Sequence, residues 1–123
     1  MPITQGAVAD ALATFLLTDL EADSTAEDNA TGNSSGNFFC VYANNTANQV
    51  ATYVKIADNS NATSNQTIPD YVFYFPGGKA LSYTVATGTA YASGLSFWAT
   101  STAASNTAQT NPATKTTVRI LAT

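Results

Sequence analysis

The sequence predicts an all-β protein, an antiparallel β-sandwich of about seven to eight strands. From Asn37 onward, short apolar runs alternate with turn residues at fairly even spacing, which is the pattern of a sandwich or barrel. Charged residues make up only 10% of the chain, so Thr, Asn, Ser and Ala must supply much of the surface. Thr favours strands, whereas Asn and Ser favour turns. A chain of 123 residues has enough material for one sandwich core, so residues 1–123 are predicted to form a single domain.

The first clear strand is predicted over residues 38–43, and both of its faces are apolar. Side chains alternate between the faces as Phe38, Cys40 and Tyr42 against Phe39 and Val41. An Asn-rich turn leads to a second strand over residues 50–57, and the two are predicted to pair as a hairpin. Cys40 is the only cysteine and is expected to be a small buried apolar residue, because no His and no nearby Lys or Arg would lower its pKa.

Two further strands follow a polar loop over residues 58–66. The first covers residues 67–75, where Pro69 must lie at an edge or at the start because it has no N–H to donate. A Pro-Gly-Gly break ends this strand. The second covers residues 79–85 and shows the alternation of a half-buried strand, with three large residues on its inner face: Leu81, Tyr83 and Val85.

The last two strands are predicted over residues 95–102 and 115–121, separated by a loop of low hydrophobicity. In the first of them the apolar side chains alternate with a mixed face, as Leu95, Phe97 and Ala99 against Ser96, Trp98 and Thr100. In the second, Val118 and Ile120 alternate with Arg119. Both are therefore expected to turn one face to the core.

The residues before position 37 are less regular. Val8, Leu12, Phe15 and Leu16 fit one face of a helix, but Leu12 and Leu16 also fall with Leu20 on one side of a strand, so periodicity leaves helix and strand both open. Polar and charged residues interrupt the apolar stretch and no basic segment precedes it, so neither a signal peptide nor a membrane span is predicted. Acidic residues crowd positions 19–28, a pattern typical of a solvated loop, and their role is left open.

The residue content argues against an enzyme. The chain has no His, which removes Ser-His-Asp and Cys-His catalysis and ordinary zinc chemistry. Outside the acidic segment, a glycosidase-like carboxylate pair would have to come from Asp10, Asp58 and Asp70. We therefore expect no catalytic residues, no cofactor and no metal site. Direct nucleic-acid binding is also disfavoured, because the net charge is −4 and only four residues are Lys or Arg.

Aromatic residues are the remaining candidates for a binding surface. Most are expected in the core, but Tyr53, Tyr74 and Trp98 lie off the predicted inner faces. Tyrosine and tryptophan are favoured anchors of protein interfaces and can also stack on sugars. These three residues are the predicted interface members.

From about Phe38 to the C-terminus, the order of features resembles a family of small virion proteins of tailed bacteriophages with a β-sandwich or jelly-roll fold. Four motifs carry the resemblance: Ala51–Asp58 (ATYVKIAD), Thr67–Pro69 (TIP), Phe75–Lys79 (FPGGK) and Tyr91–Phe97 (YASGLSF). Within the unclear N-terminal third, the resemblance favours a strand over residues 12–20, an arm over residues 1–8 and a long, mobile polar loop over residues 21–37.

The resemblance implies a structural protein of the phage particle that acts by self-association and by contacting other particle proteins. Within that class it implies a capsid decoration (cement) protein, a homotrimer on the capsid surface that binds the major capsid protein. It brings no catalytic residues, and it implies no contact with a membrane. A neck or tail component stays open, as does a carbohydrate-binding or receptor-binding module, and a small glycosidase-like enzyme is the most remote alternative.

Overall fold

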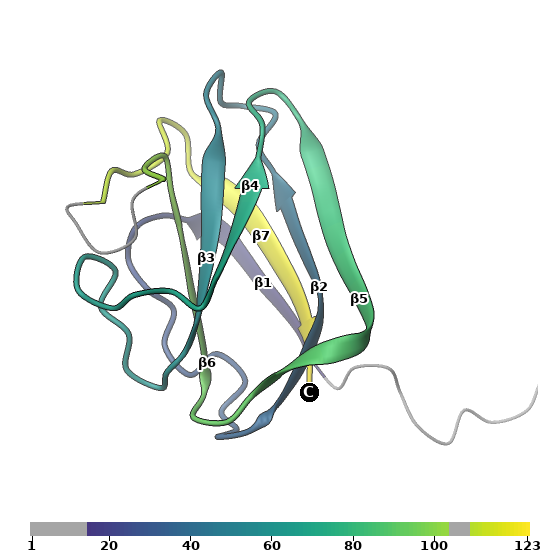
Figure 1. Ribbon diagram of the computed structural model, residues 1–123. Helices are drawn as coiled ribbons and strands as arrows, with labels where there is room; N and C mark the ends of the chain where they lie inside the picture. Colours follow the sequence, from purple (N-terminus) through teal and green to yellow (C-terminus); the bar gives the residue numbers. More distant parts are fainter. Residues whose placement is uncertain (1–14, 104–108) are drawn as a thin grey trace, which may run out of the picture.

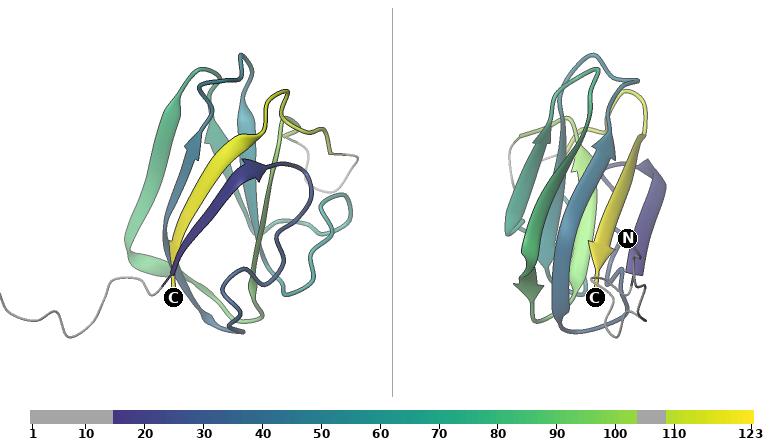
Figure 2. Two further views of the ribbon diagram at one scale, coloured as in Figure 1. Left: turned by 180° about the vertical axis from the view of Figure 1, so that it is seen from behind. Right: turned by 90° about the vertical axis from the view of Figure 1, so that its right-hand side faces the viewer.

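The computed structural model describes residues 15–103 and 109–123, and within them the chain folds into two antiparallel sheets packed face to face (Figure 1). Sheet A has four strands in the order β1-β7-β2-β5, which lie side by side in Figure 2 (left), and sheet B has three in the order β4-β3-β6. The strands are β1 (Phe15–Ala22), β2 (Gly36–Asn44), β3 (Thr52–Asp58), β4 (Tyr71–Phe75), β5 (Ala80–Tyr91), β6 (Leu95–Thr100) and β7 (Thr116–Ala122). The predicted all-β sandwich is confirmed. No helix in the described part of the chain is long and apolar enough to cross a membrane.

The strand order is that of a jelly roll. Residues 23–30 run beside β6 and add an irregular fourth member to sheet B, joined to it by a bridge between Glu27 and Phe97. With this segment counted, the chain changes sheet at every connection except the one from β3 to β4. Two four-membered layers wound in this way make a jelly roll.

The core lies between the sheets and is built from alternate residues of each strand. In sheet B the inner positions predicted from the sequence are confirmed at β3 and β6, where Val54, Ile56, Leu95 and Phe97 are buried. In sheet A, Val118 and Ile120 of β7 face them. Because side chains alternate with a period of two along a strand, the inward positions of straight strands could be predicted from sequence alone.

Strand β2 departs from the predicted alternation because it contains a β-bulge at Phe39. The register with both neighbours shifts between Phe38 and Cys40. The extra residue moves the following side chains to the opposite face, so Val41 is buried while Cys40 and Tyr42 are only half-buried. The predictions that Phe38, Cys40 and Tyr42 share a face and that Cys40 is buried are therefore wrong.

The predicted hairpin between residues 38–43 and 50–57 is also wrong, because β2 and β3 belong to different sheets. Each strand has an apolar face, and placing the two in opposite layers lets those faces cover each other. The crossing is held by Asn45, which is fully buried. Its Nδ2 donates to the carbonyls of Val50 at 3.0 Å and Phe75 at 3.2 Å, and its Oδ1 accepts from Asn48 Nδ2 at 2.8 Å and Thr52 Oγ1 at 2.7 Å.

The N-terminal third is partly as predicted. Residues 15–22 form a strand and not a helix, as the resemblance favoured, whereas the predicted arm over residues 1–8 and the first residues of the predicted strand lie outside the described residues. The long loop predicted over residues 21–37 is shorter, because β1 ends at Ala22 and β2 begins at Gly36. Part of it runs along β6, where its backbone has ladder partners: the N–H of Ala30 donates to the carbonyl of Leu95 at 2.7 Å and that of Ala99 to the carbonyl of Asp23 at 2.8 Å.

Candidate functional site

The three aromatic residues predicted to form an interface all lie on the outer face of sheet B. Tyr53 and Tyr74 are directly opposite each other on β3 and β4, with ring centroids 5.6 Å apart. Tyr74 is 51% exposed and Tyr53 is half-buried. These two side chains are therefore available, at least in part, to a partner.

Trp98 is not available in the same way, because it is buried within the chain itself. It packs in a second, smaller core with Ala57, Ala62 and Ala26, which come from β3 and from two loops that fold over sheet B. The sequence correctly places Trp98 off the inner face, but the loops that cover it could not be predicted from strand periodicity. The prediction of Trp98 as a surface anchor is corrected accordingly.

Lys55, which lies beside Trp98 on the outer face of sheet B, is also buried, and its contacts come from the loop after β6. Its Nζ donates to the carbonyl of Thr102 at 2.7 Å and to Oε1 of Gln109. Burial lowers the pKa of this ammonium group below its usual 10.5. The contacts hold the loop after β6 against the sheet, which is a structural role.

Sequence reasoning missed a group of exposed apolar side chains, which lies where the outer strands of the two sheets, β4 and β5, adjoin. Among the described residues, six of the ten exposed large apolar side chains belong to these two strands. We call this surface the β4–β5 edge, and define it by Tyr71, Val72, Tyr74, Leu81, Tyr83 and Val85. Figure 2 (right) views the molecule from this side.

The edge is open because β5 is much longer than the strand that faces it. Leu81, Tyr83 and Val85 point inward, as predicted, but they remain 39%, 39% and 41% exposed, respectively. Tyr83 reaches the opposite sheet: its ring lies 5.4 Å from those of Phe73 and Phe75. Inward side chains are covered only where another layer stands opposite, and β4 has five residues against the twelve of β5.

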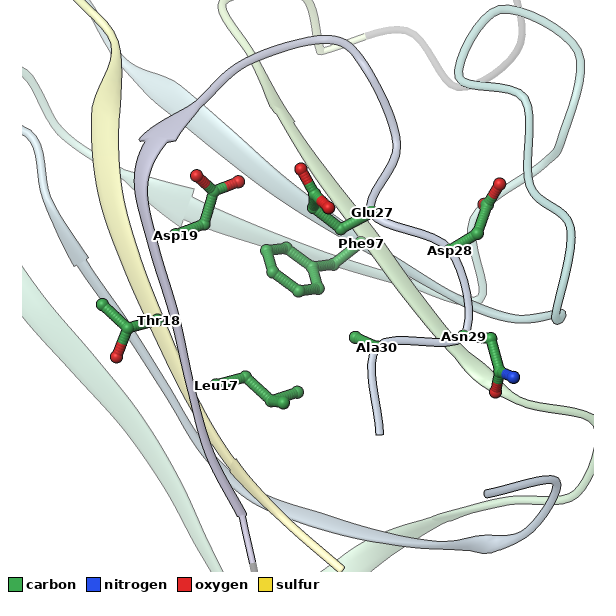
Figure 3. Close-up of a pocket in the computed structure, with 8 residues that line it drawn as sticks. All are labelled: Leu17, Thr18, Asp19, Glu27, Asp28, Asn29, Ala30 and Phe97. Carbon is green, nitrogen blue, oxygen red and sulfur yellow. The ribbon is translucent and has the colours of Figure 1, made fainter. Parts of the chain in front are cut away.

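A shallow hollow of about 370 Å³ lies on the other side of the sandwich, between β1 and residues 27–30 (Figure 3). Leu17, Ala30 and Phe97 form its apolar part, and the carboxylates of Asp19 and Glu27 stand at one end. Burial and then the negative charges of Asp19 and its acidic neighbours raise the pKa of Glu27 above 4.5. Within residues 15–103 and 109–123, no group of three or more His, Cys, Asp or Glu could hold a metal ion.

The carboxylates considered for glycoside hydrolysis organise loops. Asp58 accepts hydrogen bonds from the backbone N–H groups of Ala92 at 2.9 Å and Ser93 at 2.7 Å, which fixes the turn between β5 and β6. Asp70 accepts one from the N–H of Asp58 at 2.7 Å. Asp10 lies outside the described residues. Asp58 and Asp70 therefore have a structural role in holding loop backbone.

Comparison with known proteins adds no relative: no family model, no curated protein and no solved structure matches the chain. The β4–β5 edge, with Tyr53 beside it, is thus the candidate functional site on the strength of its geometry and composition.

Proposed function

We propose that the protein is a non-enzymatic structural subunit of a tailed-phage particle, and that it binds other protein surfaces as a capsid decoration protein. The observation that carries the proposal is the β4–β5 edge. It gathers six exposed apolar side chains on two strands without a charged residue. Exposed apolar side chains that gather at one margin of a molecule are candidates for an interaction site.

The virion part of the proposal is supported by the motif order, whose elements fall together in space. Ala51–Asp58 contains β3, Thr67–Pro69 leads into β4, and Phe75–Lys79 makes the turn from β4 to β5. Tyr91–Phe97 connects β5 to β6. The resemblance therefore concerns sheet B and the strand that borders it, which is also where the candidate surface lies.

Self-association and contact with the major capsid protein are both part of the proposal. The resemblance implies a homotrimer. A sandwich with a large apolar edge meets the physical requirement of a decoration protein, which must cover seams between neighbouring subunits through many contacts of modest strength.

The test is co-sedimentation of the purified chain with expanded capsids assembled from a tailed-phage major capsid protein. Saturable binding is expected, weakened by Tyr74→Ala and unchanged by the control Leu16→Ala, whose side chain is 61% exposed on β1. A glycan array serves as the counter-test. Failure to bind capsids together with saturable sugar binding that Tyr74→Ala abolishes would replace the proposal by the carbohydrate-binding alternative.

A further inference from the structure

We infer that the free edge of β5 pairs with β5 of a second copy of the chain, antiparallel and about a two-fold axis perpendicular to sheet A. The inference rests on the proposed self-association and names its surface, and it gives a two-fold dimer in place of the trimer that the resemblance implies. It is tested in solution without a capsid, so that its outcome is independent of capsid binding.

The free edges of the sandwich differ in how they are protected. On sheet B, residues 23–30 cover the outer side of β6, and the other edge strand, β4, is only five residues long. On sheet A, β1 carries Asp19 and Glu21, whereas β5 has neither a charge nor a proline along its whole length. Monomeric proteins usually block an edge strand with charge, proline or a covering segment, because unpaired N–H and C=O groups recruit another strand. Strand β5 has none of these three protections.

The second argument is the accessibility of the β5 backbone. Strand β5 forms the outer margin of the molecule in Figure 1, and no described element lies beyond it. It pairs regularly with β2 from Ala80 to Thr84, and its register then shifts before Thr89. The first part of β5 is thus a regular strand with one side paired and one side open, and a new pairing is expected to centre there.

The third argument concerns register. A two-fold axis perpendicular to the sheet keeps inward side chains inward, and centring it on Tyr83 sets Tyr83 opposite itself. Leu81 of each copy then lies opposite Val85 of the other, so the three half-covered side chains gain cross-strand neighbours. On the outer face, Ser82 lies opposite Thr84 of the second copy. The strand is therefore self-complementary in shape and polarity on both faces.

The fourth argument is charge complementarity at the ends of the β4–β5 edge. Asp70 immediately precedes β4, and Lys79 immediately precedes β5. Because β4 and β5 run in opposite directions and are joined by one turn, these two exposed residues lie at opposite ends of β4. The two-fold axis brings the Lys79 end of each copy to the Asp70 end of the other. Opposite charges then lie at the same end of the seam twice, and their attraction favours a second copy over an unrelated apolar strand.

The experiment measures molar mass over a concentration series by sedimentation equilibrium. The wild-type chain is expected at twice its 12.7 kDa. Ser82→Lys/Thr84→Lys places like charges directly across the seam and is expected to raise the dissociation constant by at least about tenfold. Ser82→Lys/Thr84→Glu places opposite charges across the same seam and is expected to restore the dimer. Both double variants change exposed positions, and their thermal unfolding verifies that they fold.

The matched control changes the other edge of sheet A. Leu16→Lys/Leu20→Lys replaces two exposed apolar side chains on β1, 61% and 66% exposed, and is expected to leave the dimer intact. A wild-type monomer at all concentrations, a trimer, or equal dissociation of the two β5 variants would overturn the inference. So would a dimer lost on removal of residues 1–14, because the edge would then receive that segment of a neighbour.

The two proposals fail separately. A monomer that still binds capsids removes the β5 pairing and leaves the proposed function in place. A dimer that shows the expected charge-swap behaviour but binds no capsid supports the β5 pairing and removes the proposed capsid binding.

Discussion

The two sides of the sandwich differ in how the chain finishes them. Along β6, residues 23–30 supply backbone partners: Glu27 donates to Phe97 at 2.8 Å and accepts from it at 3.1 Å. At the opposite side, β4 and β5 belong to different sheets and share no ladder, and the Tyr83 hydroxyl donates a hydrogen bond to the carbonyl of Tyr74 at 2.5 Å. The β6 side of the sandwich is thus closed by a paired segment, whereas the β4–β5 side is left open.

The difference teaches that burial of an inward side chain depends on what stands opposite. Phe97 and Tyr83 are both aromatic and both point between the sheets. Phe97 is 3% exposed because the 23–30 segment and sheet A enclose it, whereas Tyr83 is 39% exposed because only the short β4 faces it. The closed side should therefore contribute more to folding stability, and the open side should contribute more to association. Four substitutions test this contrast.

On the closed side, Phe97→Ala removes a fully packed ring and leaves a cavity between the sheets. We expect the free energy of unfolding to fall by about 3–5 kcal/mol. Urea unfolding followed by the fluorescence of Trp98, which lies next in sequence, provides the measurement. A loss below about 1 kcal/mol would mean that the closed side is not where the core is tight.

Also on the closed side, Ser96→Ala removes the hydroxyl that joins two loops to β6. Its oxygen accepts from the N–H of Asn29 at 3.1 Å and donates to the carbonyl of Asn59. Since Ser96 is fully buried, we expect a loss of about 1–3 kcal/mol. Hydrogen exchange should accelerate at the amide of Asn29 and not at β7. Unchanged exchange there would show that the 23–30 segment is held by its other contacts.

On the open side, Tyr83→Phe removes the hydroxyl bonded to Tyr74 and keeps the ring. We expect a loss of no more than about 1 kcal/mol, because water can replace this bond at an exposed site. Chemical denaturation at a protein concentration low enough to keep the chain monomeric isolates the effect on folding. A loss as large as that of Ser96→Ala would mean that the open side contributes to stability as much as the closed side.

The smallest effect is expected from Glu27→Gln, at the rim of the hollow on the closed side. The raised pKa of Glu27 means that its protonated form is favoured on folding, first by burial and then by repulsion from Asp19, Asp23 and Asp28. This contribution is present in full below pH 4.5 and is lost as the pH rises through the raised pKa. The variant should match the wild type in acid and be slightly more stable near neutrality.

Thermal unfolding of both proteins across that pH range provides the measurement. A variant that is less stable than the wild type near neutrality would contradict the sign, and would show that the Glu27 carboxylate is stabilised by the fold.

Much of this fold could be predicted because a pleated strand repeats every two residues. The inward positions of β3, β4, β6 and β7 follow from that period, and so does the outward direction of Tyr53 and Tyr74. The lack of histidine in the sequence likewise argues against histidine-dependent catalysis and ordinary zinc sites. These properties are local, so neighbouring residues are enough to determine them.

Three features required the tertiary structure. The bulge at Phe39 shifts β2 by one residue, and only the register with β5 and β7 reveals it. The position of β3 in the opposite sheet depends on the buried Asn45 network, which joins residues from separate turns. The burial of Trp98 depends on loops that fold back over sheet B.

The candidate site also combines features that the sequence predicts with features that depend on the tertiary structure. The sequence alone determined that Leu81, Tyr83 and Val85 alternate toward the core, and it determined that no charge interrupts β5. Only the tertiary structure decided that β5 is an edge strand and that a shorter strand faces it, which leaves those side chains half-covered. The physical reason is that alternation fixes the direction of a side chain, whereas its burial depends on atoms that distant parts of the chain bring opposite to it.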